Sequence, residues 1–158
     1  MRSRSESGRR LCALLLGALV TVVAGAQTPE ASSELEGSAW QLVKIEGSDG
    51  KIHAPTERVR YMISFAPHGE LLARIDCNRG SGTWRSTDNG QLRFGDLATT
   101  RVQCAANSLY DLIIAQWTHV RSYALREGHL FLTLPGDGVY EFEPLPIAAS
   151  TPALPPKS

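Results

Sequence analysis

Apolar and polar residues alternate through most of the middle of the chain. Short runs in which every second residue is apolar are separated by turn-forming pairs such as Asn89-Gly90 and Glu127-Gly128. This pattern is typical of antiparallel strands joined by hairpins. The runs predict strands at residues 39–45, 60–65, 70–76, 82–86, 91–94, 122–126, 129–134 and 139–143. Each has one apolar face, so one side of the sheet should be packed and the other wet.

The pattern changes once, between residues 107 and 121. Apolar residues there recur every three or four positions, which is the period of a helix that buries one face. They are Leu109, Leu112, Ile113, Trp117 and Val120. Ser108 and Asp111 are spaced as a pair that caps a helix N-terminus. We therefore predict an α+β domain: a strongly curved antiparallel sheet or open barrel of about eight strands, with one amphipathic helix packed against it.

Residues 1–26 have the composition of a secretory signal peptide. Four arginines precede an apolar run that ends at Val23, and Ala24-Gly25-Ala26 supplies a small-residue cleavage site. The apolar run is shorter than the roughly 20 residues of a membrane-spanning helix, so no span is expected after cleavage. Cys12 begins that run instead of following the cleavage site, which argues against a lipoprotein. We predict a periplasmic or secreted protein cleaved after Ala26, and association with the outer membrane is compatible with this.

Cleavage also changes the charge and sets the domain limits. The chain has 16 basic and 16 acidic residues, and the leader takes four arginines and one glutamate with it, which leaves a net charge of −3. No basic excess remains to favour nucleic acid. Residues 27–36 are polar and aperiodic and predict a flexible lead-in. Residues 146–158 predict a Pro-rich disordered tail, which leaves one domain at 37–145.

Cys77 and Cys104 are the two cysteines that remain after cleavage. Because even numbers of cysteines in exported chains usually pair, we predict a disulfide that ties the turn after one strand to the entrance of the helix. Free thiols or half of a metal site are the alternatives. No histidine lies within six residues of either cysteine, so a zinc site is not expected.

The segments around these cysteines carry two linked motifs, Cys-Asn-x-x-x-Gly at 77–82 and Thr-x-x-x-Cys at 100–104. With the tryptophan of the first strand and the later helix, they resemble the META domain, which includes bacterial HslJ-like heat-shock proteins. The resemblance covers roughly residues 37–142. Asp76 stands where that family usually has glycine, Trp84 where tyrosine is common, and residues 101–103 where a methionine-rich triplet is usual.

The resemblance implies an envelope or secreted protein linked to stress, antibiotic tolerance or secretion. It also implies a bond between the two cysteines and no established catalytic reaction. In agreement, no catalytic, metal or cofactor constellation stands out among the residues. Ser81 lacks the spacing of a nucleophile elbow and is expected to be a turn residue, and the four histidines have no metal-ligand spacing.

Polar residues near the predicted disulfide are the candidate binding residues, because a rigid loop can present a binding surface. They are Asp76, Asn78, Arg79, Thr99, Thr100 and Arg101. The alternative is structural: Asn78 would cap its own turn and Asp76 would pair with a nearby arginine. Trp40, Trp84 and Trp117 are expected in the core, or else lining a cleft for an acyl chain or hydrophobic drug.

Three functions remain open at this stage. The first is a monomeric, non-catalytic envelope protein that binds a hydrophobic ligand or an envelope protein through the loops around the two cysteines. The second is a periplasmic inhibitor of a hydrolase such as lysozyme, with the disulfide-held loop entering the enzyme's cleft. The third is a purely structural scaffold.

Overall fold

The computed structural model describes residues 34–87 and 89–145. The predicted leader, the first part of the lead-in and the predicted tail lie outside the described residues. The strands are β1 (Ala39–Glu46), β2 (Ile52–His53), β3 (Tyr61–Phe65), β4 (Glu70–Ile75), β5 (Asn78–Ser86), β6 (Leu92–Phe94), β7 (Ala98–Thr99), β8 (Ser122–Arg126), β9 (His129–Thr133) and β10 (Val139–Pro144). One α-helix, α1 (Tyr110–Gln116), and short 3₁₀ turns at Arg58–Arg60, Pro67–Gly69, Trp117–His119 and Pro135–Asp137 complete the described part.

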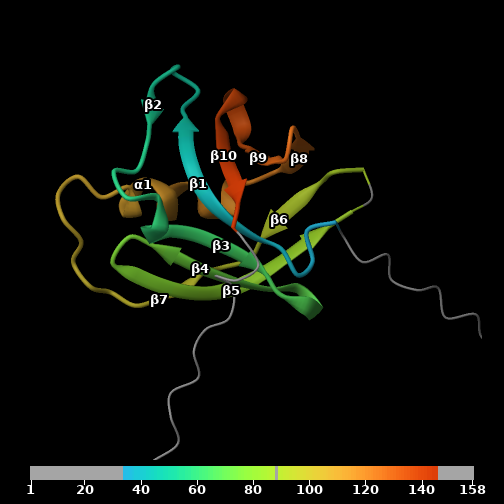
Figure 1. Ribbon diagram of the computed structural model, residues 1–158, viewed down its shortest axis with the longest axis horizontal. Helices are drawn as coiled ribbons and strands as arrows, with labels where there is room; N and C mark the ends of the chain where they lie inside the picture. Colours follow the sequence, from blue (N-terminus) through green and yellow to red (C-terminus); the bar gives the residue numbers. More distant parts are fainter. Residues whose placement is uncertain (1–33, 88, 146–158) are drawn as a thin grey trace, which may run out of the picture. The chain divides into compact units, whose positions relative to one another are not determined.

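The strands form one antiparallel sheet that curls back on itself. Eight strands follow the order β6-β5-β4-β3-β1-β10-β9-β8, while β2 pairs with β1 and β7 pairs with β5. In Figure 1, β3, β4 and β5 run side by side, and β1 leads from them to β10 and β9. The two ends of the path meet, because Gln91 bridges Ser122 and the Leu92 N–H donates to the Arg121 carbonyl (3.0 Å). The result is a mostly β, nearly closed barrel with one short helix, which confirms the predicted curved sheet.

The hairpin between β8 and β9 shows how the turn residues set the register. Glu127 and Gly128 both have positive φ, 52° and 79°. Two successive positive φ values are the geometry of the type I′ turn, whose twist matches the twist of paired strands. Arg126 consequently lies opposite His129, and the register continues to Ser122 opposite Thr133.

β5 differs most from the predicted pattern. It begins at Asn78, four residues before the predicted start, so Ser81 is a strand residue opposite Leu72 and not a turn residue. The glycines on both sides of Ser81 are needed because another segment crosses β5 closely. A Cβ at Gly80 would lie 2.9 Å from the Ala98 carbonyl oxygen, and one at Gly82 would lie 2.8 Å from the Asp96 carbonyl oxygen. The sequence Gly-Ser-Gly thus indicates close backbone approach, and the unpredicted β7 provides it.

The helix is shorter than its apolar period suggests. It begins at Tyr110 and continues as a 3₁₀ turn to His119, whereas residues 107–121 were predicted. At the start, the Leu109 N–H donates to the Tyr61 hydroxyl (3.1 Å), and Ser108 Oγ accepts from the Tyr110 N–H (3.1 Å). At the end, the Arg121 N–H donates to the Thr133 carbonyl (2.9 Å). Bonds to the sheet therefore replace helical bonds at both ends.

The core lies between the curved sheet and the helix. Its buried apolar residues come from β1, β3–β6, β9, β10 and the helical segment. Trp117 packs against Phe94 of β6, with ring centroids 4.8 Å apart, and so fixes the helical segment on the sheet. Leu35 is fully buried, so packed structure begins two residues before Gly37, where the domain was predicted to start. Within the described ranges, no helix is long and apolar enough to cross a membrane.

Candidate functional site: the disulfide corner

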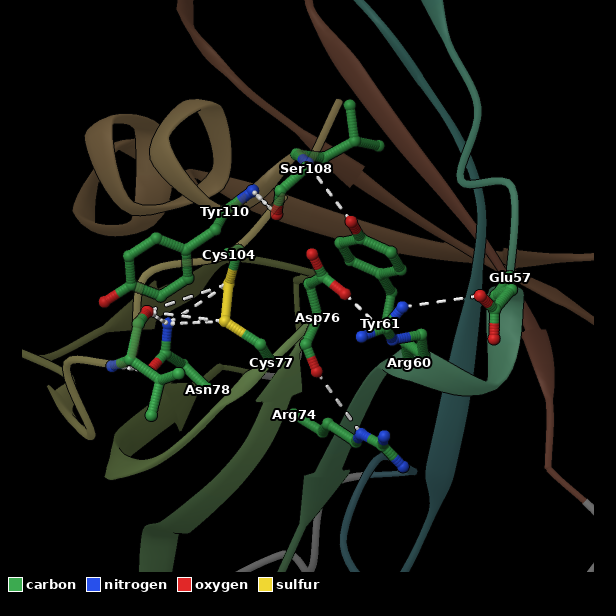
Figure 2. Close-up of polar contacts among 12 residues, drawn as sticks. Glu57, Arg60, Tyr61, Arg74, Asp76, Cys77, Asn78, Cys104, Ser108 and Tyr110 are labelled. Carbon is green, nitrogen blue, oxygen red and sulfur yellow. Dashed lines mark hydrogen bonds and ion pairs between the residues drawn. A yellow bond between two sulfur atoms is a disulfide. The ribbon is translucent and has the colours of Figure 1, made fainter. Parts of the chain in front are cut away.

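Cys77 and Cys104 form a disulfide, with Cα atoms 5.5 Å apart and a separation of 27 positions along the chain. Cys77 lies in the turn between β4 and β5, and Cys104 lies between β7 and the helix. Figure 2 shows this bond beside the side chains of Asp76 and Asn78. We call residues 76–79 and 99–104 the disulfide corner. The pairing predicted from the sequence is present.

Asn78 holds the two segments of the disulfide corner together from inside. Its side chain is 0% exposed. Its Nδ2 donates to the Val102 carbonyl (2.9 Å), and its Oδ1 accepts from the Val102 N–H (2.8 Å) and the Thr100 hydroxyl (2.9 Å). These bonds use both ends of the amide, so Asn78 bridges to the second segment and does not cap its own turn.

Asp76 is the second buried polar residue of the corner, at 5% exposed. Its Oδ1 lies 2.9 Å from Arg60 Nε, and Arg74 Nε donates to its backbone carbonyl (3.4 Å) (Figure 2). Its φ of 55° is in the left-handed region, which glycine adopts without strain and other residues only at a cost. Glycine, which the family that this chain resembles usually has at this position, would adopt such a backbone freely. Here an aspartate held by an arginine takes its place.

The outer surface of the disulfide corner is formed by Arg79, Thr100, Arg101 and Val102. All four are exposed, and the Val102 side chain is 58% exposed although it is apolar. Both backbone groups of Val102 are held by Asn78, so its side chain has a fixed outward position. Thr99, by contrast, turns inward and its hydroxyl shares a hydrogen bond with the Tyr110 hydroxyl (2.8 Å). Asp76, Asn78, Thr99 and the Thr100 hydroxyl thus build the corner, while the side chains of Arg79 and Arg101 are displayed on it.

The three tryptophans lie in the core and none is exposed. Each indole N–H donates within the domain: Trp40 to Ser38 Oγ, Trp84 to the Ala66 carbonyl and Trp117 to the Gly95 carbonyl. The apolar cavity beside Trp117 measures about 30 Å³. Ligand pockets have volumes of roughly 300–1,000 Å³, so this space is too small for an acyl chain.

The sequence pattern did not indicate Val102 of the corner or Arg60, which contacts the corner through Asp76. Arg60 was missed because it lies 16 positions before Asp76, and no local pattern links the two. Val102 was missed because a single apolar residue in a loop gives no pattern that distinguishes a binding residue from any other exposed residue.

Burial raises the pKa of the Tyr140 phenol, whose hydroxyl donates to Gln116 Oε1 (2.7 Å) at the end of the helix. Among residues 34–87 and 89–145, no cluster of His, Cys, Asp or Glu could hold a metal.

The fold and the corner define a small, disulfide-bonded, antiparallel β domain with one short helix. The family model for the META domain matches residues 33–145. The chain therefore belongs to the META domain family.

Solved structures share the fold. A protein from Burkholderia xenovorans, determined by NMR, is 20% identical with a TM-score of 0.61, over 70% of this chain and 83% of its own. A DUF4847 family protein from Bacteroides vulgatus, in a crystal structure, is 14% identical with a TM-score of 0.52, over 70% of this chain and 94% of its own. At these identities the likeness concerns the fold alone. No match was found among curated proteins.

Proposed function

We propose that this META domain is an exported, non-catalytic envelope protein that recognises another envelope protein through the outer surface of the disulfide corner. The observation that carries the proposal is the displayed set of Arg79, Arg101 and Val102. An apolar side chain and two exposed arginines stand on a backbone held by the disulfide and by Asn78. Pre-organisation of this kind lowers the entropy cost of binding, and arginine is among the residues enriched at interfaces.

The interior argues against a bound hydrophobic molecule. The tryptophans are hydrogen-bonded parts of the core, and the cavity of about 30 Å³ is an order of magnitude too small for a drug or lipid chain. Recognition at the surface is therefore the better supported form of the binding hypothesis. Fatty acids and hydrophobic antibiotics should leave the thermal unfolding temperature of the isolated domain unchanged.

A site-specific cross-linking experiment in cells tests the proposal. A photoreactive amino acid replaces Val102 in one strain and Ile52 in another. Ile52 is a matched control, because it is 61% exposed and lies on β2, away from the disulfide corner. We expect a cross-linked envelope protein from position 102 alone, lost when Arg79→Ala or Cys77→Ser is added. Equal products from both positions, or none from position 102, would overturn the proposal.

The second candidate is inhibition of a periplasmic hydrolase such as lysozyme. One observation favours it: Arg79 is exposed, lies directly after the disulfide turn, and forms no ion pair among the described residues. A guanidinium that has no carboxylate partner in its own domain and stands on a rigid edge could reach the paired carboxylates of a glycosidase cleft. Inhibition by the wild type that disappears in Arg79→Ala, with unchanged thermal stability, would support it. Full lysozyme activity in the presence of the wild type would exclude it.

A link to envelope stress is part of the proposal and comes from the family resemblance. A strain without this protein should be more sensitive to hydrophobic antibiotics or to heat. Complementation with Val102→Asp should fail if the disulfide corner is the working surface. Complementation with Ile52→Asp should succeed.

A further inference from the structure

Two pairs of arginines face each other across neighbouring strands on the outer side of the sheet. Arg74 of β4 lies directly opposite Arg79 of β5, and Arg85 of β5 lies directly opposite Arg93 of β6. The residues flanking them along the strands, such as Ile75, Trp84 and Phe94, are buried. Because strand residues alternate between the two faces, the four arginines share the outer face. We call these four residues the arginine face.

This arrangement costs stability, since like charges directly opposite each other in a sheet repel. None of the four forms an ion pair with a carboxylate in the described part of the chain. Glu70 is the acidic residue on the same face of β4, and it lies opposite Thr83. Asp96 is exposed after β6. An uncompensated feature of this kind indicates a functional surface more often than a structural one.

The two members of each pair have different surroundings. Arg74 donates to the Asp76 carbonyl, and Arg93 donates to the Leu92 and Arg121 carbonyls, so these two guanidinium groups are anchored. Arg79 and Arg85 are exposed and their side chains have no partner among the described residues. In each pair, therefore, one arginine is held in place by carbonyl groups and the arginine opposite it is free to contact a ligand.

Arg79 and Arg85 lie on one strand, six positions apart. At about 3.4 Å per residue they are separated by about 20 Å. The outward residues between them are Ser81 and Thr83, which are small and polar. The arginine face therefore has a pair of positive charges at each end of β5. The pair that contains Arg79 lies at the disulfide corner.

We propose that the arginine face binds an acidic protein surface that carries two groups of carboxylates about 20 Å apart. This rests on the proposed function and names the chemistry of its partner. Guanidinium groups bind carboxylates through two parallel hydrogen bonds, and two such positions fix the orientation of the partner. The same charges speed the encounter with an acidic partner.

Anionic membranes and single-stranded nucleic acid fit the arginine face less well than an acidic protein does. Proteins that bind membrane surfaces insert tryptophan, phenylalanine or leucine beside their basic residues. All three tryptophans are buried here, and Leu72 is the one large apolar residue exposed on the outer side of β3–β6. Single-stranded nucleic acid is bound with aromatic side chains that stack on bases. The outer side of β5 has none, and the chain without its leader carries a net charge of −3.

The decisive variant is Arg79→Glu combined with Arg85→Glu. Each change places a glutamate opposite an arginine, so two repulsive pairs become attractive ones. The double variant should be as stable as the wild type or more stable, while its affinity for an acidic ligand falls by about tenfold or more. A variant that misfolds would instead lose stability and affinity together. Arg126→Glu on β8 is the control for each single replacement, Arg79→Glu or Arg85→Glu, and makes half the charge change of the double variant.

The probe is a fluorescent oligoglutamate peptide, followed by anisotropy with the protein from residue 27 onward at about 0.02 M salt. We expect binding by the wild type and by Arg126→Glu, weakening with added salt, and loss in the double variant. Phosphatidylglycerol vesicles and single-stranded DNA are measured in parallel. Absence of oligoglutamate binding, an unchanged affinity of the double variant, or tighter binding to vesicles or DNA would overturn the proposal. A cross-link at position 102 that is lost in Arg79→Ala but survives Arg85→Glu would leave the proposed function standing without the arginine face, because Arg85 lies outside the disulfide corner.

Discussion

Arg60 holds the carboxylate of Asp76, with 2.9 Å between Arg60 Nε and Asp76 Oδ1. The contact joins the turn that contains Cys77 to the residue that precedes β3, and it lies beside the disulfide (Figure 2). It also accounts for a non-glycine residue with a φ of 55°. The ion pair offsets the strain of the left-handed backbone.

The loss of stability on replacing Asp76 should therefore depend on how easily the new residue adopts a positive φ. Asp76→Ala loses the charged hydrogen bond and keeps the strain, so its free energy of unfolding should fall by about 2–3 kcal/mol. Asp76→Gly loses the same bond but adopts the positive φ freely, so it should be about 1 kcal/mol more stable than the alanine variant. Urea unfolding of the three proteins measures this order.

The matched control for Asp76 is Glu57→Ala. Glu57 also contacts Arg60, at 3.3 Å, but on the surface, and its removal should change stability by less than about 0.5 kcal/mol. If the glycine variant proved less stable than the alanine variant, backbone strain at position 76 would not be the governing term.

Asn78 can be tested by changing one atom of its amide. In Asn78→Asp an oxygen replaces Nδ2, which donates to the Val102 carbonyl over 2.9 Å. The buried carboxylate would face that carbonyl, so its pKa in the folded state should lie above the value of about 3.9 in the unfolded state. Stability should consequently fall as pH rises from 4 to 7, in contrast to the wild type. Thermal unfolding across this range provides the measurement, and a flat profile would show that the corner rearranges.

The disulfide closes a loop of 27 residues, which corresponds to about 3–4 kcal/mol of stability. The variant Cys77→Ser with Cys104→Ser should unfold at a lower temperature. It should also be cleaved faster by trypsin after Arg101, because hydrogen bonds alone, among them those of Asn78, then hold that segment. Ellman titration of the denatured, unreduced protein from residue 27 onward should find no free thiol. Two thiols would contradict the bond.

Tyr140 predicts a loss of stability in alkaline solution. Burial raises the pKa of its phenol, so between its ordinary value of about 10 and the higher folded value the unfolded chain ionises and the folded one does not. The contribution is complete below pH 10 and decreases as pH rises above it. Tyr140→Phe removes this titration and the bond to Gln116, so it should be about 1 kcal/mol less stable at pH 7. Its stability should decrease less steeply between pH 10 and 11 in urea titrations, and equal slopes would assign the effect to other groups.

Much of this molecule was predictable from local pattern. Alternation and turn residues located the eight strands of the barrel path, since side-chain alternation follows directly from strand geometry. Errors arose where contacts distant in sequence replaced local bonds: at Gly80 and Gly82, which admit the crossing segment of β7, and at the helix, whose ends bond to Tyr61 and Thr133.

In the candidate site, too, local pattern predicted some features and contacts distant in sequence decided the others. The cysteine pairing was predicted from the expected leader and the even number of cysteines after it, and the structure shows this bond. The polar residues beside the cysteines were predicted to bind a partner, and that role stays a prediction. Which of them are buried was decided by the tertiary structure, because Asn78 and Asp76 find partners 24 and 16 positions away in Val102 and Arg60. The facing arginines of β4, β5 and β6 likewise depend on strand register, which hydrogen bonding between strands determines and which no single segment contains.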